Sequence, residues 1–411
     1  MISGVTPPDV LVVGASVAGL STVEALRRKG YEGKVTVLGD EPHAPYDRPP
    51  LSKQVLSGAW EPERARLRRH DALSALAADF VLGDAATALD VGADQGSAIV
   101  HTAAGRTWSA GAVVVATGAR PRPLPGMPGM PGMPGLAGVH LLRTLDDAIA
   151  LRANLLTASR LVVVGDGVLG AEVAATATSM GLAVTLTGPQ RLPMAGQLGT
   201  LVAARLAALH TARGVNLRLG EAVDGLVGER GTVTGVRLGG GEVIAADVVV
   251  AIGAIPHTSW LESSGLRLDD GLVCDEHCRA ADRVYAVGDV ARWRHEALGL
   301  SRLENRTNAT EQARVVAAGI MGEQLRYAPV PYFWTDQFDV KIQVHGTLAA
   351  RAEVTIVDGE IGEGRFVARY ERDGAVTGVL GWNMPKQTRL RRQEILDSLT
   401  PAPGTSHREK T

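Results

Sequence analysis

Short apolar runs that end in glycine and lead into a helical pattern occur twice along the chain. The first reads "VLVVGASVAGLSTVEAL" from Val10 and predicts a strand over 10–13, a helix over about 18–29 and a strand over 35–38. The second reads "VVVGDGVLGAEVAA" over 162–175, and the same order repeats between 161 and 186. Two βαβ units of this kind imply parallel sheets covered by helices, so the pattern indicates an α/β fold.

Three further apolar segments each run into a glycine. They read "AVVVATGARP" from Ala112, "DVVVAIGAIP" from Asp247 and "VYAVGD", which ends at Asp289. We expect these segments to be buried strands that lie beside the two βαβ units.

The pattern changes after about Tyr327. In "DVKIQVHG" the apolar residues Val340, Ile342 and Val344 alternate with polar ones, which is typical of a half-buried antiparallel strand. "FVARYERDGAVTGVLGW" predicts a hairpin that turns at Asp373-Gly374, and a basic helix, "KQTRLRRQEILDSL", follows. This part of the chain therefore indicates a small α+β domain, whose tail from Pro401 we expect to be disordered.

Pro-Gly-Met occurs three times in "PLPGMPGMPGMPGLAGVH", between the first "ATG" and the second βαβ unit. Such a repeat forms neither a helix nor a central strand, because proline lacks a backbone donor. We interpret it as an exposed, partly extended connector at a domain boundary. A repeat expansion without a function explains this composition.

Charge and hydropathy exclude several classes of partner. Lys and Arg number 42 against 44 Asp and Glu, which gives a net charge of −2 and no electrostatic reason to expect nucleic acid. No window of about 18 residues is predominantly apolar, and the start lacks a basic segment followed by an apolar one. We therefore expect a cytoplasmic protein without a membrane span.

The first glycine turn predicts a dinucleotide site. Gly14, Ser16 and Gly19 occupy the three positions of the turn, with a small serine in place of the usual middle glycine. A small residue there lets a pyrophosphate approach the backbone N–H groups at a helix N-terminus. Asp40 stands 21 positions after Gly19, where a carboxylate would bind the ribose hydroxyls.

The second turn is complete, with Gly165, Gly167 and Gly170, and predicts a second dinucleotide site. No acidic residue follows the second strand of this unit. An acid there would repel the 2′-phosphate of NADPH, so the sequence does not disfavour NADPH. Arg191 is near enough in sequence to contact a 2′-phosphate, and a solvated loop arginine is an equally good interpretation. The choice between NADH and NADPH stays open.

The loop "HAPYDRPPLSKQ" follows the first βαβ half. Its three prolines stiffen the chain and hold Arg48 and Lys53 in fixed directions. Two fixed cations beside a phosphate-binding turn suit an anionic cofactor. From the residues alone, a surface loop with salt bridges is equally compatible.

Six motifs together carry a specific resemblance over essentially the whole chain before the tail. In chain order they read "PYDRPPLSK", "VVVATGARPRPLPG", "LLRTLDDA", "GDGVLGAEVAATA", "VYAVGDVAR" and "TNATEQARVVAAGI". The sequence resembles the FAD-containing, NAD(P)H-dependent ferredoxin reductases that serve oxygenases. The resemblance implies two Rossmann-like dinucleotide-binding domains of the glutathione reductase type, with FAD held tightly at the first turn and NAD(P)H bound as co-substrate at the second.

The resemblance also implies domain limits and FAD contacts. The FAD domain would comprise 1–118 and 254–328, the NAD(P)H domain 119–253 and the C-terminal domain 329–411. Asp289 would bind the ribityl chain. The residues that match FAD contacts of the family are Ala18, Asp40, Arg48, Lys53, Ala86 or its neighbour, Arg143 and Asp289. The other cofactor-binding residues that we expect, besides the second turn and Arg191, are Gly14, Ser16, Gly19, Thr117, Gly118, Gly253 and Arg306.

Two residues match the family's catalytic positions. Lys53 would lie near flavin N5 and pair with Glu172 of "GAE", so that a cation favours the negative charge arriving with the hydride. For Glu172 the alternative is an acid in the first turn of a helix, favoured there by the helix dipole.

Arg306 departs from the family, which usually carries Trp at this position. The helix that starts near Thr307-Asn308 would point its N-terminus at the flavin. A guanidinium beside it adds charge and donors on the side where the ferredoxin docks.

The two cysteines, Cys274 and Cys278, are too few for a disulfide scaffold. Their positions differ from those of the redox disulfides in related flavoproteins. With His277 they are too close together to form a tetrahedral metal site, so we expect a structural role and no metal.

The resemblance implies a [2Fe–2S] ferredoxin as partner. A basic run on the last helix could steer an acidic ferredoxin, or could be an ordinary solvated face. The run comprises Lys386, Arg389, Arg391 and Arg392. A rubredoxin reductase, an NAD(P)H oxidase and a redox-sensing protein similar to apoptosis-inducing factor are the alternatives, and both a monomer and a homodimer stay open.

Overall fold

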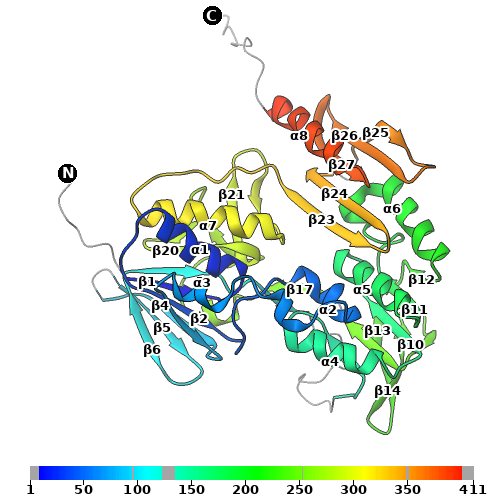
Figure 1. The fold of residues 1–411 in the computed structure, drawn as a ribbon, viewed down its shortest axis with the longest axis horizontal. Helices are drawn as coiled ribbons and strands as arrows, with labels where there is room; N and C mark the ends of the chain where they lie inside the picture. Colours follow the sequence, from blue (N-terminus) through cyan, green and yellow to red (C-terminus); the bar gives the residue numbers. More distant parts are fainter. Residues whose placement is uncertain (1–8, 95–96, 123–134, 252, 349–350, 400–411) are drawn as a thin grey trace, which may run out of the picture.

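The structure is a computed structural model that describes residues 9–94, 97–122, 135–251, 253–348 and 351–399. It has three parts, which are blue to cyan with yellow, green, and orange to red in Figure 1. The Pro-Gly-Met repeats and the tail from Pro401 lie outside the described residues, so the expectations about them stay predictions.

A six-stranded sheet with the order β19-β20-β7-β1-β2-β3 forms the first part. The central strand β1 (Val10–Val13) is buried along its whole length and runs parallel to both β2 (Val35–Gly39) and β7 (Ala112–Val115). The adjacent strands β2 and β7 are likewise buried and rich in Val, as expected for a parallel sheet that is covered on both faces. The other strands are β3 (Asp79–Leu82), β19 (Arg279–Ala281) and β20 (Val284–Ala286).

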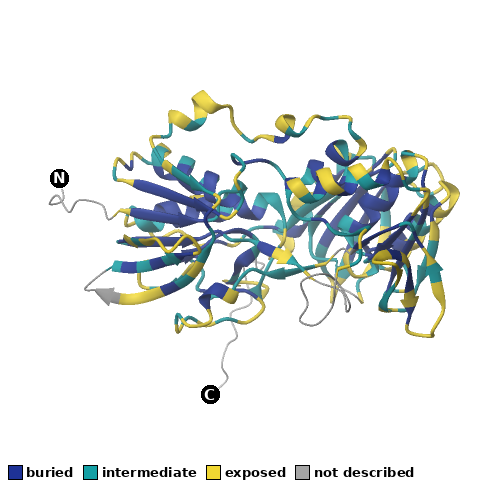
Figure 2. Ribbon diagram, turned by 90° about the horizontal axis from the view of Figure 1, so that it is seen from below, coloured by how far each residue is buried: buried dark blue, intermediate teal, exposed yellow. Residues whose placement is uncertain are grey.

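Two helices pack against each other beside this sheet and share its core, namely α1 (Val17–Arg28) and α7 (Arg306–Ile320). An antiparallel sheet contributes to the same core through Leu89 and Val100. Its strands are β4 (Ala86–Asp94), β5 (Ser97–Thr102) and β6 (Thr107–Ala110). Figure 2 shows that the buried residues gather in the strands and on the inward helix faces.

The second part repeats this plan with a five-stranded parallel sheet in the order β12-β11-β10-β16-β9. A small antiparallel sheet and three helices surround it. The strands of the parallel sheet are β9 (Val139–Leu141), β10 (Arg160–Val164), β11 (Ala183–Gly188), β12 (Asn216–Leu219) and β16 (Val248–Ala251). The antiparallel strands are β13 (Val223–Glu229), β14 (Thr232–Leu238) and β15 (Val243–Ala245), and the helices are α4 (Leu145–Leu155), α5 (Val168–Ser179) and α6 (Ala195–Ala212).

The third part is a five-stranded antiparallel sheet in the order β23-β24-β27-β26-β25, with one helix. Its hairpin turns at Asp373 and Gly374, both with positive φ, as the sequence predicts. Leu198 and Leu206 of α6 share a core with this sheet, so the third part is anchored on the second. The elements are β23 (Tyr332–Gln337), β24 (Val340–Gly346), β25 (Glu353–Glu360), β26 (Arg365–Arg372), β27 (Ala375–Trp382) and α8 (Pro385–Leu399).

The chain passes between the first and second parts twice, and the two connecting segments lie side by side. The strands β8 (Ala119–Pro121) and β17 (Ala254–Pro256) pair antiparallel there. The residue limits of the domains stay a prediction. The remaining elements are η1 (Pro49–Ser52), α2 (Gln54–Ser57), η2 (Pro62–Ala65), α3 (His70–Ser74), η3 (Ser259–Leu261), β18 (Leu272–Cys274), η4 (Gly288–Val290), β21 (Ala291–His295) and β22 (Gly299–Ser301).

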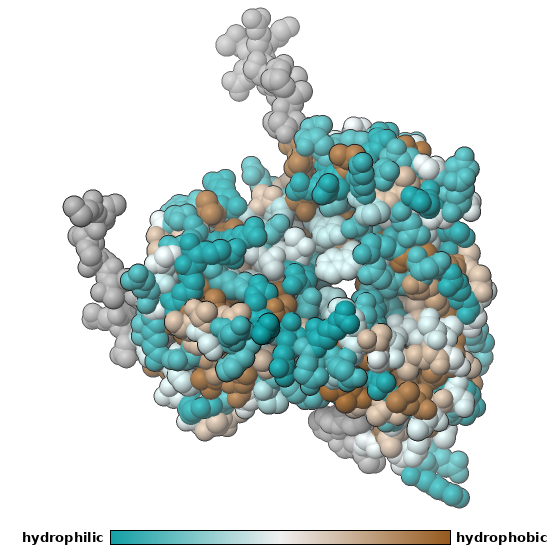
Figure 3. Space-filling view, viewed as in Figure 1, coloured by the Kyte–Doolittle hydropathy of each residue, from teal (hydrophilic) through white to brown (hydrophobic). Residues whose placement is uncertain are grey.

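The fold therefore confirms the predicted class, with two Rossmann-like sheets and a small α+β domain. None of the described helices combines the length and apolar character needed to cross a membrane. On the face drawn in Figure 3, hydrophilic residues predominate and apolar ones are scattered among them.

Candidate functional site

A cleft opens at the carboxyl edge of the first sheet, where ligands bind in open parallel sheets. Gly14 follows β1, Asp40 follows β2 and Ala116 follows β7, and all three line the cleft. The cleft brings together ten of the predicted cofactor residues. They are Gly14, Ser16, Ala18, Asp40, Arg48, Ala86, Thr117, Gly118, Arg143 and Asp289.

The first glycine turn is shaped by close backbone contacts. Gly14 has φ +124°, and a Cβ atom there would lie 2.2 Å from the carbonyl oxygen of Ala116. A Cβ at Gly19 would lie 1.9 Å from the carbonyl oxygen of Gly14, so Gly19 packs beneath the turn and does not line the cleft. Ser16 is the N-cap of α1, but its side chain makes no capping hydrogen bond. The first N–H groups of α1 are thus left to an anion in the cleft.

Asp40 and Glu41 differ in what they bind. Asp40 is exposed, and its carboxylate forms no hydrogen bond or ion pair with the described residues. Glu41 instead accepts hydrogen bonds from Tyr46 Oη and, at 2.9 Å, from Arg48 Nη2. Asp40 is therefore the carboxylate that remains available for ribose hydroxyls in this cleft.

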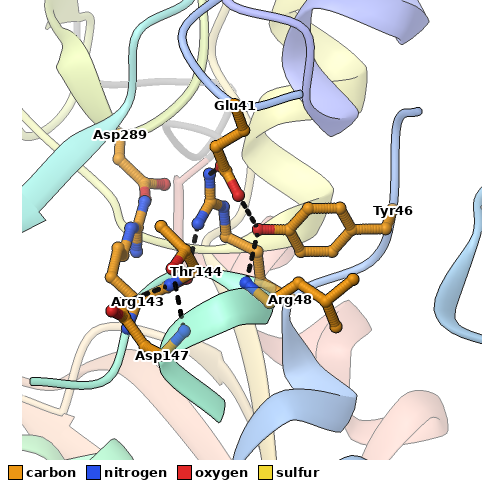
Figure 4. Close-up of polar contacts among 8 residues, drawn as sticks. Glu41, Tyr46, Arg48, Arg143, Thr144, Asp147 and Asp289 are labelled. Carbon is orange, nitrogen blue, oxygen red and sulfur yellow. Dashed lines mark hydrogen bonds and ion pairs between the residues drawn. The ribbon is translucent and has the colours of Figure 1, made fainter. Parts of the chain in front are cut away.

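The proline loop is held against the start of α4 by a network that Figure 4 shows. Arg48 donates from Nη1 to the carbonyl oxygen of Arg143, and the backbone N–H of Leu145 donates to Tyr46 Oη at 3.0 Å. Burial raises the pKa of Tyr46, so its hydroxyl stays protonated. The loop therefore has a fixed position beside the cleft.

Arg143 and Asp289 face each other in the cleft, with 2.9 Å between Nη2 and Oδ2. Asp289 lies in η4, directly after β20, and Arg143 lies between β9 and α4. Asp147 helps to fix this segment, because its carboxylate accepts from the backbone N–H groups of Arg143 and Thr144 (Figure 4).

Lys53 and Glu172 form a nearly buried ion pair, with 2.7 Å between Nζ and Oε2. Their side chains are 13% and 6% exposed. Glu172 lies in α5, after the second glycine turn, and also accepts hydrogen bonds from Ser52 Oγ at 2.6 Å and Thr335 Oγ1 at 2.8 Å. The first turn of α5 contains no acid, and Glu172 lies beyond it, so the alternative of an acid favoured in the first turn is wrong. The carboxylate is instead bonded across the fold. That Lys53 and Glu172 are catalytic stays a prediction.

The second glycine turn has the same backbone shape as the first. Gly165 has φ +132°, and a Cβ at Gly170 would lie 1.8 Å from the carbonyl oxygen of Gly165. A Cβ at Gly167 would meet nothing within 4 Å. Glycine at 167 is therefore not required by the packing of the chain, whereas a ligand pyrophosphate would need that space.

Around this turn, Asp166 is buried and accepts hydrogen bonds from the backbone and side chain of Gln190, both at 2.7 Å. Arg191 is exposed and makes no hydrogen bond or ion pair with the described residues. Its position leaves both interpretations of Arg191 open.

Comparison with known proteins gives the family. Residues 8–313 match the family model "Pyridine nucleotide-disulphide oxidoreductase", and residues 332–406 match "Reductase C-terminal". The chain belongs to the pyridine nucleotide-disulphide oxidoreductases. Within this family it is 35% identical to rhodocoxin reductase of Rhodococcus erythropolis, over 96% of this chain and 91% of that protein.

Other members show the same likeness. The chlorobenzene dioxygenase ferredoxin reductase component of Cupriavidus sp. (strain PS12) is 36% identical over 92% of this chain and 90% of its own length. The crystal structure of a covalent putidaredoxin reductase–putidaredoxin complex matches with a TM-score of 0.89 and 33% identity, over 96% of this chain and 94% of that chain.

In this oxidoreductase, Arg306 is the first residue of α7, one position earlier than the sequence predicts. It forms an ion pair of 2.8 Å with Asp47 of the proline loop and does not line the cleft. Ala309, one turn later, does line it, so the N-terminal turn of α7 reaches the cleft. Gly253 lies beside Arg122, at the crossing between the first two parts, and also does not line the cleft.

The sequence interpretation missed several cleft residues of the oxidoreductase, chiefly Glu41, Tyr46, His257 and Trp260. The sequence does contain a signal for Glu41 and Tyr46. Glu41 follows Asp40 at the strand end, and Tyr46 stands two positions before Arg48 in the proline loop. His257 and Trp260 follow β17 and have no such signal. Burial lowers the pKa of His257, and Asp40 partly offsets this effect.

The basic residues of α8 fall into two groups. Lys386, Arg389 and Arg392 are exposed. Arg391 instead pairs with Asp358 at 2.8 Å and with Glu394 at 2.7 Å, which holds α8 against β25. Arg391 therefore has a structural role, and docking near the others stays a prediction.

Cys274 and Cys278 are both buried, and neither forms a disulfide. Burial raises the pKa of both thiols, which keeps them protonated and unreactive. The described residues contain no cluster of three His, Cys, Asp or Glu side chains that could hold a metal.

Proposed function

We propose that this chain is an FAD-dependent NAD(P)H:ferredoxin reductase, which takes two electrons from NAD(P)H and passes them singly to a [2Fe–2S] ferredoxin that feeds an oxygenase. The observation that carries the proposal is the ion pair of Lys53 and Glu172. It joins the loop beside the first glycine turn to the helix that follows the second. The names of the relatives, which are reductases of rhodocoxin, putidaredoxin and a dioxygenase ferredoxin, support the same activity.

FAD fits the residues of the first cleft. The uncapped start of α1 would receive its pyrophosphate, and the unpaired carboxylate of Asp40 would accept hydrogen bonds from its ribose. Arg143 and Asp289 offer a donor and an acceptor to the polar part of the cofactor. When bound, FAD supplies the capacity to accept two electrons together and release them one at a time.

The second turn would hold NAD(P)H. Its open Gly167 leaves room for a pyrophosphate, and α5 begins directly after it. Arg191 is free to contact a 2′-phosphate, but no residue of the turn demands one. We therefore propose NAD(P)H without a preference for either coenzyme.

Lys53 would supply positive charge where the hydride arrives. Glu172 and Ser52 hold its environment fixed, so the ammonium does not need to reorient during the reaction. No side chain is required as an acid or base for hydride transfer itself, because catalysis rests on position and charge. The domain limits given above and a cytoplasmic location are part of this proposal.

A parallel assay with two donors and several acceptors tests the proposal. Purified protein should be yellow and should reduce [2Fe–2S] ferredoxins with NADH or NADPH faster than it reduces rubredoxin or oxygen. Faster rubredoxin reduction, or peroxide formation as the main reaction, would assign one of the alternatives. Colourless protein that takes up no flavin and oxidises neither coenzyme would end the proposal.

A further inference from the structure

The carboxylate of Glu172 receives a hydrogen bond from the C-terminal sheet, which belongs to neither nucleotide-binding part. Thr335 of β23 is fully buried, and its Oγ1 lies 2.8 Å from Glu172 Oε1. The other carboxylate oxygen, Oε2, accepts from Lys53 and Ser52. Each oxygen of this buried carboxylate thus accepts at least one hydrogen bond, which fixes the orientation of the carboxylate.

Gln337, two residues along β23, sets the direction of the Thr335 hydroxyl. Its Nε2 donates to Thr335 Oγ1 at 3.1 Å, and the same group lies 3.2 Å from Met194 Sδ. Because Thr335 accepts from Gln337, its own single proton points to Glu172. A flipped amide would instead place the oxygen of Gln337 against the sulfur of Met194.

His210 of α6 fixes the orientation of Gln337. Its Nε2 lies 2.7 Å from Gln337 Oε1, and an amide oxygen can only accept, so the hydrogen of His210 is on Nε2. Its Nδ1 is buried without a partner, and the ring of Phe338 packs against it at 5.2 Å. Burial lowers the pKa of His210, which keeps the ring neutral with Nε2 as donor.

These contacts form one directed series, in which each group donates to the next. It runs from His210 through Gln337 and Thr335 to Glu172, and Lys53 donates to the same carboxylate from the other side. Hydrogen bonds in such a series polarise one another in the same sense. Among the described residues, Lys53 alone has a charged side chain within ion-pair distance of Glu172.

We propose that Thr335 and Gln337 are positioning residues, which hold the Glu172 carboxylate aimed at Lys53 through a hydrogen-bond relay that begins at His210. This inference rests on the role proposed for Lys53 in hydride transfer. It gives the C-terminal sheet a part in the first half-reaction, besides any contact with the acceptor. Thr335 hydrogen-bonds to Glu172 and to Gln337, so the relay reaches Lys53 through Glu172.

The test compares three variants with the flavin-bound parent. Thr335→Val removes the donor at nearly constant volume, Thr335→Ser retains it, and Thr388→Val is the matched control. Thr388 is also a fully buried threonine of the C-terminal part, but its hydroxyl donates to the carbonyl oxygen of Met384. Stopped-flow absorbance follows reduction of the flavin over a range of NAD(P)H concentrations that reaches saturation.

A readout independent of turnover accompanies the kinetics. Carboxyl resonances of protein labelled with [5-¹³C]glutamate are recorded by NMR at one fixed pH, and Glu172→Gln identifies the resonance of Glu172. Thr335→Val should slow flavin reduction about tenfold, with the KM for NAD(P)H unchanged. The carboxyl resonance of Glu172 should also move, because one oxygen loses its donor. Thr335→Ser should restore both, and Thr388→Val should match the parent.

Parental rates and an unmoved Glu172 resonance in Thr335→Val would overturn the relay. If Thr335→Val does not fold, Gln337→Met removes the donor to Thr335 and should move the same two readouts by less. Failure of the proposed function is distinguishable, because the parent itself would then leave its flavin oxidised with both coenzymes while the Glu172 resonance could still be measured.

Discussion

Arg143 and Asp289, which are 146 positions apart in the sequence, are joined by a 2.9 Å ion pair in the cleft of the first sheet. Asp289 lies in η4, beside the sheet of the first part, and Arg143 lies between β9 and α4 of the second part. The pair therefore links the first part of the molecule to the second. Any ligand of the cleft meets both charges.

Asp289→Asn should weaken flavin binding about tenfold or more. The variant keeps the size of the side chain but removes the negative charge, and a hydrogen bond to a charged group contributes roughly 1.5–3 kcal/mol. The flavin-to-protein ratio after dialysis and the Kd from flavin titration measure the effect. Asp247→Asn is the control, because Asp247 pairs with Arg160 outside the cleft and should leave flavin binding unchanged.

Lys53→Met should slow reduction of the flavin by NAD(P)H about 10- to 100-fold, as expected when a fixed charge at a reaction centre is lost. Binding of FAD should change little, because Lys53 does not line the cleft that holds most of the predicted contacts. Stopped-flow absorbance measures the rate. Lys29→Met, which breaks an exposed ion pair of equal length with Glu323, should retain the parental rate. Equal rates in Lys53→Met and the parent would remove the role of Lys53.

Much of the fold was predictable from the sequence, because the signals are local. The strand over 10–13 and the turn at Asp373-Gly374 both lie where the pattern places them. Apolar runs, glycines with positive φ and period-two alternation depend on neighbouring residues alone. The helix at Arg306 begins one residue early because Asn305 is its N-cap and accepts from the N–H of Asn308.

The site was predictable only where a residue type has one common use. Asp40 at a strand end has such a use, and so do the glycines of both turns. The engagement of Arg391 by Asp358 and the bond from Thr335 to Glu172 depend on how distant elements pack. Nothing near Arg391 or Thr335 in the sequence indicates those partners, so a basic run was interpreted as uniform when it is not.

Gly167→Ala should weaken NAD(P)H binding at least tenfold while leaving stability unchanged. A methyl group at 167 meets no atom of the chain within 4 Å, but it would occupy the space needed by a pyrophosphate. Gly170→Ala should instead lower the thermal midpoint, because its Cβ would lie 1.8 Å from a backbone oxygen. Coenzyme titration and thermal unfolding measure the two effects separately. Gly362→Ala, also without a neighbour within 4 Å, should change neither quantity.

Charge reversal on α8 should separate stability from docking. Arg391→Glu sets a third acid beside Asp358 and Glu394 and should destabilise the C-terminal part by about 1 kcal/mol, since these pairs are partly exposed. Arg389→Glu should leave stability unchanged and lower ferredoxin reduction about 3- to 10-fold at low salt, with ferricyanide reduction retained. Equal losses with both acceptors in Arg389→Glu would contradict docking at this helix.

His345 should make the C-terminal part sensitive to acid. Its ring stacks on Tyr332 at 4.6 Å, and burial, helped by the charge of Arg392, lowers its pKa to about 4. Between the ordinary value of about 6.5 and about 4, the unfolded chain binds the proton more readily than the folded one. Stability is therefore unaffected above pH 6.5 and is lost as the pH falls through this window, by about 1–2 kcal/mol after allowance for partial exposure.

Calorimetry of His345→Gln measures this contribution. Between pH 7 and 4.5, the thermal midpoint of the variant should fall by about 2–4 °C less than that of the parent. The lost stacking changes the midpoint equally at both pH values, so it does not affect this difference. Other buried histidines with lowered pKa values, such as His140 and His210, titrate in both proteins and cancel in the comparison. His101→Gln removes an exposed ring that pairs with Asp90 and should not reduce the acid loss. Superimposable pH dependence of His345→Gln and the parent would show that the ring is protonated in the folded state without cost.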